Sequence, residues 1–276
     1  MEQVLKTMLE NVRAKSPLVH NITNYVTVND VANVLLAAGG SPIMSDDADD
    51  VEDITSICGG LNINIGTLNK NTIPSMFLAG KKANALGHIV LLDPVGAGAS
   101  RLRTDTANRL MREVRFDAVR GNISEIKTLC TGSGSTKGVD ADAVDAVTEA
   151  NLDDGVALVK TFAAQTGCII AVTGAIDLVS DGERCWCIRN GRAEMSRITG
   201  TGCQLSALMT AFLVANPDRK LDAAAAAVCM MGLAGEIGWA NMQPGDGNST
   251  YRNRIIDAIF NMTGDALEEG AKYELR

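Results

Sequence analysis

The sequence predicts an α/β protein in which helices cover both faces of a mostly parallel sheet. Strand-like and helix-like segments alternate over roughly the first two thirds of the chain. Two runs, "IVLL" at 89–92 and "CIIAV" at 168–172, are continuously apolar, as expected of parallel strands buried on both faces. Such alternation favours parallel strands joined by helical crossovers.

The individual elements follow from the spacing of apolar residues and from glycine and proline stops. Strands are expected at 18–22, 41–45, 61–66, 88–98, 116–122 and 168–174. Helices are expected at 4–12, 27–40, 50–58 and 72–87, through 110–111, after 122, and at 152–166, 203–215, 221–239 and 251–270. A Gly/Ser/Thr-rich stretch near 131–138 predicts a loop, and 177–195 reads as a meander with hairpin turns at Asp181-Gly182 and Asn190-Gly191.

Length and composition indicate one folded domain that binds a small molecule. The chain has 276 residues, 46% of them hydrophobic, with 27 glycines, and no shift in composition marks a boundary, so 1–276 is expected to form a single domain. The net charge of −8 and the lack of basic runs argue against nucleic acid or an anionic membrane surface as a partner.

The N-terminal segment and the cysteines favour the cytoplasm. The chain starts without a basic region followed by an apolar one, and it contains no run of eighteen apolar residues. Seven irregularly spaced cysteines favour reduced thiols over a disulfide framework. Cys185 and Cys187 flank a tryptophan, but with only His20 and His88 in the chain a zinc site is disfavoured.

Four short motifs fall at the expected carboxyl ends of strands or at the start of a helix. They are "DPVGAG" from Asp93, "RGNISE" from Arg120 to Glu125, "VTG" around Thr173, and "GTGC" at 200–203. Each has a purely structural interpretation: a turn opener at Asp93, a capping box from Asn122 to Glu125, a strand end, and tight helix packing at the glycines.

Taken together, the four motifs predict a phosphoryl-transfer site. Ligands of open α/β sheets bind beyond the carboxyl ends of the strands. Two carboxylates there suit a magnesium ion held partly through water, and a glycine turn at a helix N-terminus suits a phosphate. Arg120 adds a cation.

The same segments resemble a known family. "HNITNYV", "PIMS", "NINIGTL", "LDPVGAGAS", "VRGNISEI", "VTG" and "TGTGCQLSAL" occur in order between about residues 17 and 215, and in combination they are similar to hydroxyethylthiazole kinase. The resemblance implies a ribokinase-like fold without a separate lid domain. It also implies ATP-dependent phosphorylation of 4-methyl-5-(2-hydroxyethyl)thiazole for thiamine biosynthesis or salvage, with Mg²⁺. A homotrimer with the thiazole pocket at the subunit interface is implied as well.

The resemblance assigns roles to individual residues of this chain. Substrate binding is implied for Met44, Asn24, Gly66 and Gly200, and metal binding for Asp93 and Glu125. Nucleotide contacts are implied for Arg120, Thr173 and Asn122, and the catalytic group is Cys203 with Gly200 and Gly202 of the anion hole. One stretch, "QPGDGNSTYRNRIIDAI" at 243–259, departs from the glycine-rich segment of the family. The departure affects the part of the nucleotide site that would contact adenine, not the reaction.

Cys203 stands where related kinases carry an aspartate base, and three roles for it remain open. It could accept or orient the proton of the substrate alcohol, fill space as a small residue, or attack as a covalent nucleophile. A thiol at a helix N-terminus is expected to have a lowered pKa. Alternatives for the whole chain are a kinase of another vitamin-precursor alcohol, such as a pyrimidine or pyridine, a cysteine hydrolase, and a non-catalytic nucleotide-binding module.

Overall fold

The computed structural model describes residues 3–131 and 146–276, which contain one nine-stranded sheet. The strand order is β2-β1-β3-β4-β5-β6-β7-β8-β9. The first six strands pair in parallel, and β7, β8 and β9 pair antiparallel at one edge. The strands are β1 Leu18–Ile22, β2 Ser41–Met44, β3 Gly60–Asn64, β4 Ile89–Asp93, β5 Ala118–Asn122, β6 Ile169–Thr173, β7 Asp177–Ser180, β8 Cys185–Ile188 and β9 Tyr273–Leu275.

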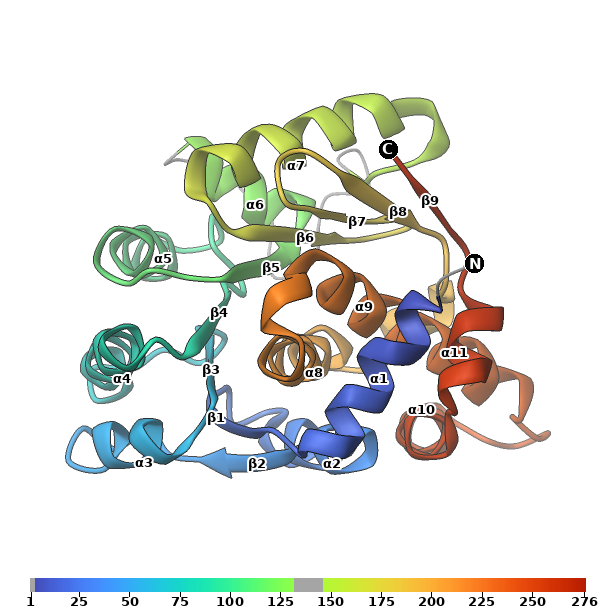
Figure 1. The fold of residues 1–276 in the computed structure, drawn as a ribbon, viewed down its shortest axis with the longest axis horizontal. Coiled ribbons are helices and arrows are strands. Elements are labelled where there is room, and N and C mark those ends of the chain that lie inside the picture. The colour runs from blue at the N-terminus through green and yellow to red at the C-terminus, as the bar shows by residue number, and fades with distance from the viewer. Residues whose placement is uncertain (1–2, 132–145) are drawn as a thin grey trace.

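Helices cover both faces of this sheet (Figure 1). One layer packs on the apolar side chains of β3, β4 and β5 and consists of α3 Val51–Ile57, α4 Thr72–Leu86, α5 Arg101–Glu113, α6 Ile123–Thr131 and α7 Leu152–Thr166. The other layer consists of α1 Val4–Lys15, α2 Val28–Ala38, α8 Thr201–Ala215, α9 Lys220–Ala240, α10 Asn248–Asn261 and α11 Gly264–Gly270. Short 3-10 turns lie at Glu149–Asn151, Ala193–Arg197 and Pro217–Arg219.

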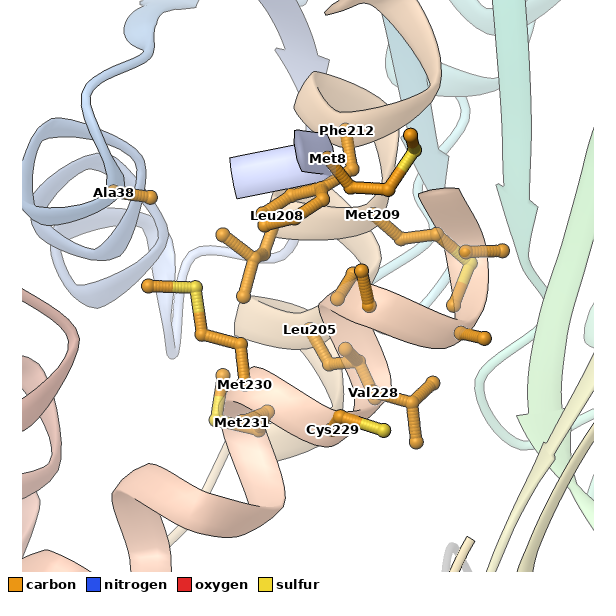
Figure 2. Close-up of a cluster of buried hydrophobic side chains, with 14 of the residues drawn as sticks. Met8, Ala38, Leu205, Leu208, Met209, Phe212, Val228, Cys229, Met230 and Met231 are labelled. Carbon is orange, nitrogen blue, oxygen red and sulfur yellow. The ribbon is translucent and has the colours of Figure 1, made fainter. Parts of the chain in front are cut away.

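The two central helices, α8 and α9, form the largest part of the core. Figure 2 shows Leu205, Leu208 and Met209 of α8 beside Val228 and Met230 of α9. Because such close packing around most of both helices leaves little room for movement, the N-terminus of α8 has a fixed position against the sheet.

The length and apolarity of α9 reflect this burial. Within the described residues, Pro217–Ala240 is long and apolar enough to cross a membrane, but 78% of its most apolar window is buried inside the protein. Its alanines, such as Ala223 and Ala227, are fully buried between the sheet and neighbouring helices. We therefore interpret α9 as a core helix.

The predicted mostly parallel α/β architecture is confirmed, with two local corrections. The Asn190-Gly191 hairpin is wrong, because β8 ends at Ile188 and its next partner is β9, at the far end of the chain. The single helix expected over 251–270 is two helices, since Thr263 accepts a hydrogen bond from the backbone N–H of Ala266 and caps a new one. Most of the loop predicted near 131–138 lies outside the described residues.

Candidate active site

The predicted strand-end motifs meet at one edge of the sheet. Asp93 at the end of β4 lies beside Asn64 at the end of β3, and Thr173 at the end of β6 lies beside Asn122 of β5. The N-terminus of α8 points at the same edge, since Ser206 in its second turn contacts Asp93. The topology therefore brings all four motifs together.

Asp93 is fully buried and keeps one oxygen free of protein contacts. Its Oδ2 accepts hydrogen bonds from Asn64 Nδ2 and Ser206 Oγ, each at 2.8 Å. Its Oδ1 has no partner among the described residues. Burial raises the pKa of Asp93, while Arg120 Nη1, 3.7 Å from Oδ2, acts in the opposite direction. Oδ1 is thus a buried acceptor without a donor from the described residues.

Glu125 combines the capping role with a carboxylate that lies near Asp93. Its backbone N–H donates to Asn122 Oδ1 at 2.9 Å, and its Oε2 accepts the N–H of Asn122 at 2.8 Å, which completes a capping box. Its Oε1 accepts from Gly96 N at 2.8 Å. Burial, and next the charge of Asp93, raise the pKa of Glu125 to about 7.

Arg120 and Gly202 lie in direct contact. Arg120 Nη2 donates to Thr173 Oγ1. A Cβ atom added to Gly202 would lie 2.4 Å from Arg120 Nη1, so only glycine lets the guanidinium lie across the start of α8. A cation, a hydroxyl and a helix N-terminus therefore converge, which is an arrangement suited to phosphate oxygens.

Both the backbone conformation at position 200 and the close approach of Thr27 require glycine there. Its φ is +83°, in the left-handed region, and an added Cβ would lie 2.1 Å from Thr27 Cγ2. It is the N-cap residue of α8. The β1–α2 segment therefore packs directly on the turn that precedes Cys203.

The predicted lowering of the Cys203 pKa is wrong. Cys203 is only 8% exposed. Burial raises the pKa of its thiol, with a further rise from the charge of Asp93, and Arg120 and the nearby Asn64 and Asn24 offset this only in part. Removal from water therefore outweighs the helix N-terminus, and Cys203 is a protonated thiol at neutral pH.

Neither histidine of the chain is placed to activate Cys203. Both ring nitrogens of His20 are engaged, Nδ1 with Thr55 Oγ1 at 3.0 Å and Nε2 with the carbonyl of Ser45 at 2.9 Å. His88 precedes β4, at the opposite end of the strand from Asp93. A covalent cysteine mechanism needs such a base, so the geometry disfavours the hydrolase interpretation.

The residues assigned to the substrate pocket surround Cys203. Asn24 Nδ2 lies 3.1 Å from Cys203 Sγ. Gly66 lies against Asn24 and Asn64, with an added Cβ 3.2 Å from Asn24 Cβ. Met44, at the end of the edge strand β2, packs against the small cluster that contains Cys203. Strands β1, β2 and β3 thus supply one side of the site.

Sequence reasoning missed several polar side chains of the site. Asn64, Ser206 and Thr27 bond to or pack against predicted residues. Asp177 accepts the N–H of Gly174 at 2.8 Å and so holds the turn after Thr173. A signal existed for Ser206, which follows Cys203 by three residues and lies on the same helix face.

Asp177 gives a pH-dependent prediction for stability. Burial raises the pKa of Asp177 to about 7, against the Gly174 N–H and the charge of Arg120, whereas an unfolded aspartate titrates near about 4. Its stabilising contribution is therefore full below about pH 4 and lost as pH rises through about 7. Asp177→Asn should flatten the fall in unfolding free energy over this range, measured by urea denaturation. Equal slopes for both proteins would contradict the assignment.

No cluster of three or more His, Cys, Asp or Glu side chains that could hold a metal ion lies within residues 3–131 and 146–276. This does not conflict with magnesium, which takes one or two carboxylates and completes its shell with water and substrate phosphates. The unpartnered Oδ1 of Asp93 and the neighbouring carboxyl group of Glu125 fit that mode of binding.

A mostly parallel sheet, with Asp93 at a strand end, Glu125 in the first turn of the helix after β5 and a glycine turn opening a central helix, has the arrangement of a small-molecule kinase of the ribokinase-like class. The fold agrees: pyridoxal kinase from Staphylococcus aureus, in complex with ADP, matches with a TM-score of 0.56 at 15% identity over 77% of this chain and 85% of that one. A hydroxyethylthiazole kinase structure from Pyrococcus horikoshii matches with a TM-score of 0.88 at 32% identity, covering 100% of both chains.

Sequence comparison narrows the class to one family. The profile of the hydroxyethylthiazole kinase family matches residues 9–265. The hydroxyethylthiazole kinase of Clostridium acetobutylicum is 58% identical over 271 residues, which is 98% of this chain and 99% of that protein. That of Ruminiclostridium cellulolyticum is 48% identical over 265 residues, or 96% and 95% of the two chains. The chain belongs to the hydroxyethylthiazole kinase family.

Proposed function

We propose that this protein transfers the γ-phosphate of ATP to the hydroxyethyl group of 4-methyl-5-(2-hydroxyethyl)thiazole, in thiamine biosynthesis or salvage. The observation that carries the proposal is the convergence of Asp93, Cys203 and the Gly200 turn at one point, in a chain of this family. An alcohol held beside Cys203 would face the phosphate-binding start of α8.

The roles of the residues follow from their surroundings. Arg120, Thr173 and Asn122 are proposed to contact the nucleotide, because the first two already form a polar pair beside α8. Gly200 and Gly202 let Thr27 and the Arg120 guanidinium pack directly on the start of α8, where the transferred group is proposed to bind. Asp93 and Glu125 would hold Mg²⁺, which when bound offsets negative charge on the phosphates.

Cys203 is proposed to orient the substrate hydroxyl. As a protonated thiol it is a poor base in the free enzyme. Phosphoryl transfer has a loose transition state in which positioning and charge neutralisation dominate. A group that fixes the direction of the alcohol therefore contributes without full ionisation.

The direct test is identification of the product. Wild-type protein incubated with ATP, Mg²⁺ and the thiazole alcohol should yield ADP and the phosphate monoester of the thiazole, identified by mass spectrometry. ADP release without that ester would overturn the proposed acceptor.

We also propose a single domain over 1–276, a homotrimeric active unit and a cytoplasmic location. The joining of C-terminal strand β9 to the same sheet supports one domain. The seven unpaired cysteines suit a reducing compartment. Near the pocket, Tyr25 is 77% exposed and Val26 57% exposed, while Met44 ends an edge strand. These apolar side chains support a shared interface.

The proposed trimer predicts that specific activity depends on concentration. If neighbouring subunits complete the pocket, dilution below the assembly constant should lower turnover per subunit. Sedimentation at the assay concentrations should show trimer loss in parallel. A fully active protein that sediments as a monomer would refute a shared pocket.

A further inference from the structure

Two buried asparagines connect Asp93 to Cys203. Asn64 Nδ2 donates to Asp93 Oδ2 at 2.8 Å, and Asn64 Oδ1 accepts from Asn24 Nδ2 at 3.2 Å. Asn24 Nδ2 also donates to Cys203 Sγ at 3.1 Å. The exposed fractions of Asn24 and Asn64 are 5% and 1%. The buried Asn24–Asn64 pair thus joins the two ends of the site.

Backbone N–H groups fix the direction of both amides. Gly66 N–H donates to Asn64 Oδ1 at 2.9 Å, so the NH2 group of Asn64 must face Asp93. Thr27 N–H donates to Asn24 Oδ1 at 3.1 Å, so the NH2 group of Asn24 must face Asn64 and Cys203. A backbone N–H can only donate, and neither amide can be flipped without losing that bond.

The Asn24 side chain has no hydrogen-bonding capacity left for a ligand. Its oxygen accepts from both Thr27 N and Thr27 Oγ1, and its two N–H groups donate to Asn64 and Cys203. An amide offers two donors and two lone pairs. The polar group of Asn24 therefore serves Cys203, and only its other surfaces are free to border the substrate.

The chain of hydrogen bonds also constrains the direction of the Cys203 thiol proton. Its sulfur is an acceptor towards Asn24, so the thiol proton must point elsewhere. At the other end, Asn64 and Ser206 both donate to Oδ2 of Asp93, which leaves Oδ1 free. The hydrogen bonds therefore fix which atom of each group is engaged: the sulfur of Cys203 accepts from Asn24, and Oδ2 of Asp93 accepts from Asn64 and Ser206.

We propose that Asn24 and Asn64 are positioning residues that present NH2 groups to Cys203 and Asp93, which orients both for phosphoryl transfer. This inference rests on the proposed function. It predicts that position 203 must hold an acceptor towards Asn24, and that a carboxylate at position 24 is tolerated only where residue 203 can donate.

A double-mutant cycle tests the Asn24 arm. Asn24→Asp is made in the C203S and C203D backgrounds. A serine hydroxyl can rotate to donate to the new carboxylate, whereas in C203D two carboxylates face each other. Repulsion between Asn64 Oδ1 and the new carboxylate occurs in both backgrounds and cancels. We expect N24D to lower kcat at least about tenfold more in C203D than in C203S, the size typical of contacting pairs.

A second cycle tests the Asn64 arm. Asn64→Asp removes the donor to Asp93 and should lower kcat about ten- to a hundredfold with little change in KM for the alcohol, as for other residues that orient a metal-binding group. In the D93N background the penalty should shrink, because an amide at position 93 can donate instead. Asn84→Asp is the matched control, since among the described residues the Asn84 side chain bonds only to the backbone of Arg115, at the opposite end of the sheet.

The outcomes separate this inference from the proposed function. Absence of thiazole phosphorylation by the wild type would overturn the proposed function alone. The same double-mutant cycles can then be measured as unfolding free energies. Two carboxylates that face each other should lower the unfolding free energy of the double variant by more than the sum of the single effects. The positioning role of Asn24 would be overturned if N24D lowered kcat by the same factor in both backgrounds, to within about twofold, and also lowered the unfolding free energy by the same amount in both.

Discussion

Asp93→Asn should lower turnover by about a hundredfold or more while leaving the protein folded. The loss is of the size found when one group that stabilises transition-state charge is removed. Both donors to Asp93, Asn64 and Ser206, bond to Oδ2. An asparagine can keep these bonds through its carbonyl oxygen, so the substitution changes chiefly the free Oδ1.

Asp93→Asn should not lower the stability of the folded protein, although it lowers turnover. Because burial raises the pKa of Asp93, its negative charge costs free energy in the apo protein. Asp93→Asn removes that cost, and the melting temperature should stay equal or rise. Activity is measured as ADP release at saturating and at limiting Mg²⁺, and stability by thermal unfolding.

A matched control lies at the opposite end of the sheet. Asp117, just before β5, accepts from Val90 N and pairs with Lys220. Asp117→Asn should leave kcat within about threefold of wild type, because it changes no charge at the site. Near-normal turnover of folded D93N at limiting Mg²⁺ would contradict the role assigned to Asp93.

Substitutions of Cys203 should give a graded series. Cys203→Ala should slow the enzyme about ten- to a hundredfold and leave measurable activity, because the alcohol loses an orienting group while the groups that neutralise charge, which dominate a loose transition state, remain. Cys203→Ser should retain more activity than alanine, because a serine oxygen can still accept from Asn24 and orient the alcohol without acting as a base. Cys203→Asp should remain active, because a carboxylate accepts the same proton and the donor from Asn24.

The series also tests a covalent pathway. Intact-mass analysis of the wild type during turnover should show no adduct on Cys203, consistent with the engagement of both ring nitrogens of His20 elsewhere. A trapped adduct, or a C203D variant without activity, would contradict the orienting role.

The sequence was sufficient to predict the parallel sheet and its functional edge. Apolar runs such as 89–92, bounded by turn residues, favour strands buried on both faces, and parallel topology places the carboxyl ends of the strands on one side. Asp93, Thr173 and the segment that carries Glu125 were therefore expected at one edge, whereas the approach of α8 to that edge is shown by the contact of Ser206 with Asp93. Confirmation of the architecture follows from this simple constraint.

Other features depend on distant partners that local patterns do not reveal. Strand β9 is short and pairs with β8 through bonds such as Cys185 N to the carbonyl of Arg276, so nothing near residue 190 indicates it. The pKa of Cys203 depends on its burial under β1 and α2, which local sequence does not specify. Likewise, Asn24 and Asn64 meet only because β1 and β3 are neighbours.

The most direct test of the proposed function is the specificity of ATP consumption by the wild-type protein. Initial rates with Mg²⁺ are compared for the thiazole alcohol and for pyrimidine and pyridine vitamin-precursor alcohols. Membership of the hydroxyethylthiazole kinase family predicts that kcat/KM for the thiazole alcohol exceeds that for each competitor by about tenfold or more, the discrimination that differences in shape within one site provide. A higher kcat/KM for another alcohol, or no alcohol-dependent ATP consumption, would contradict the proposed function.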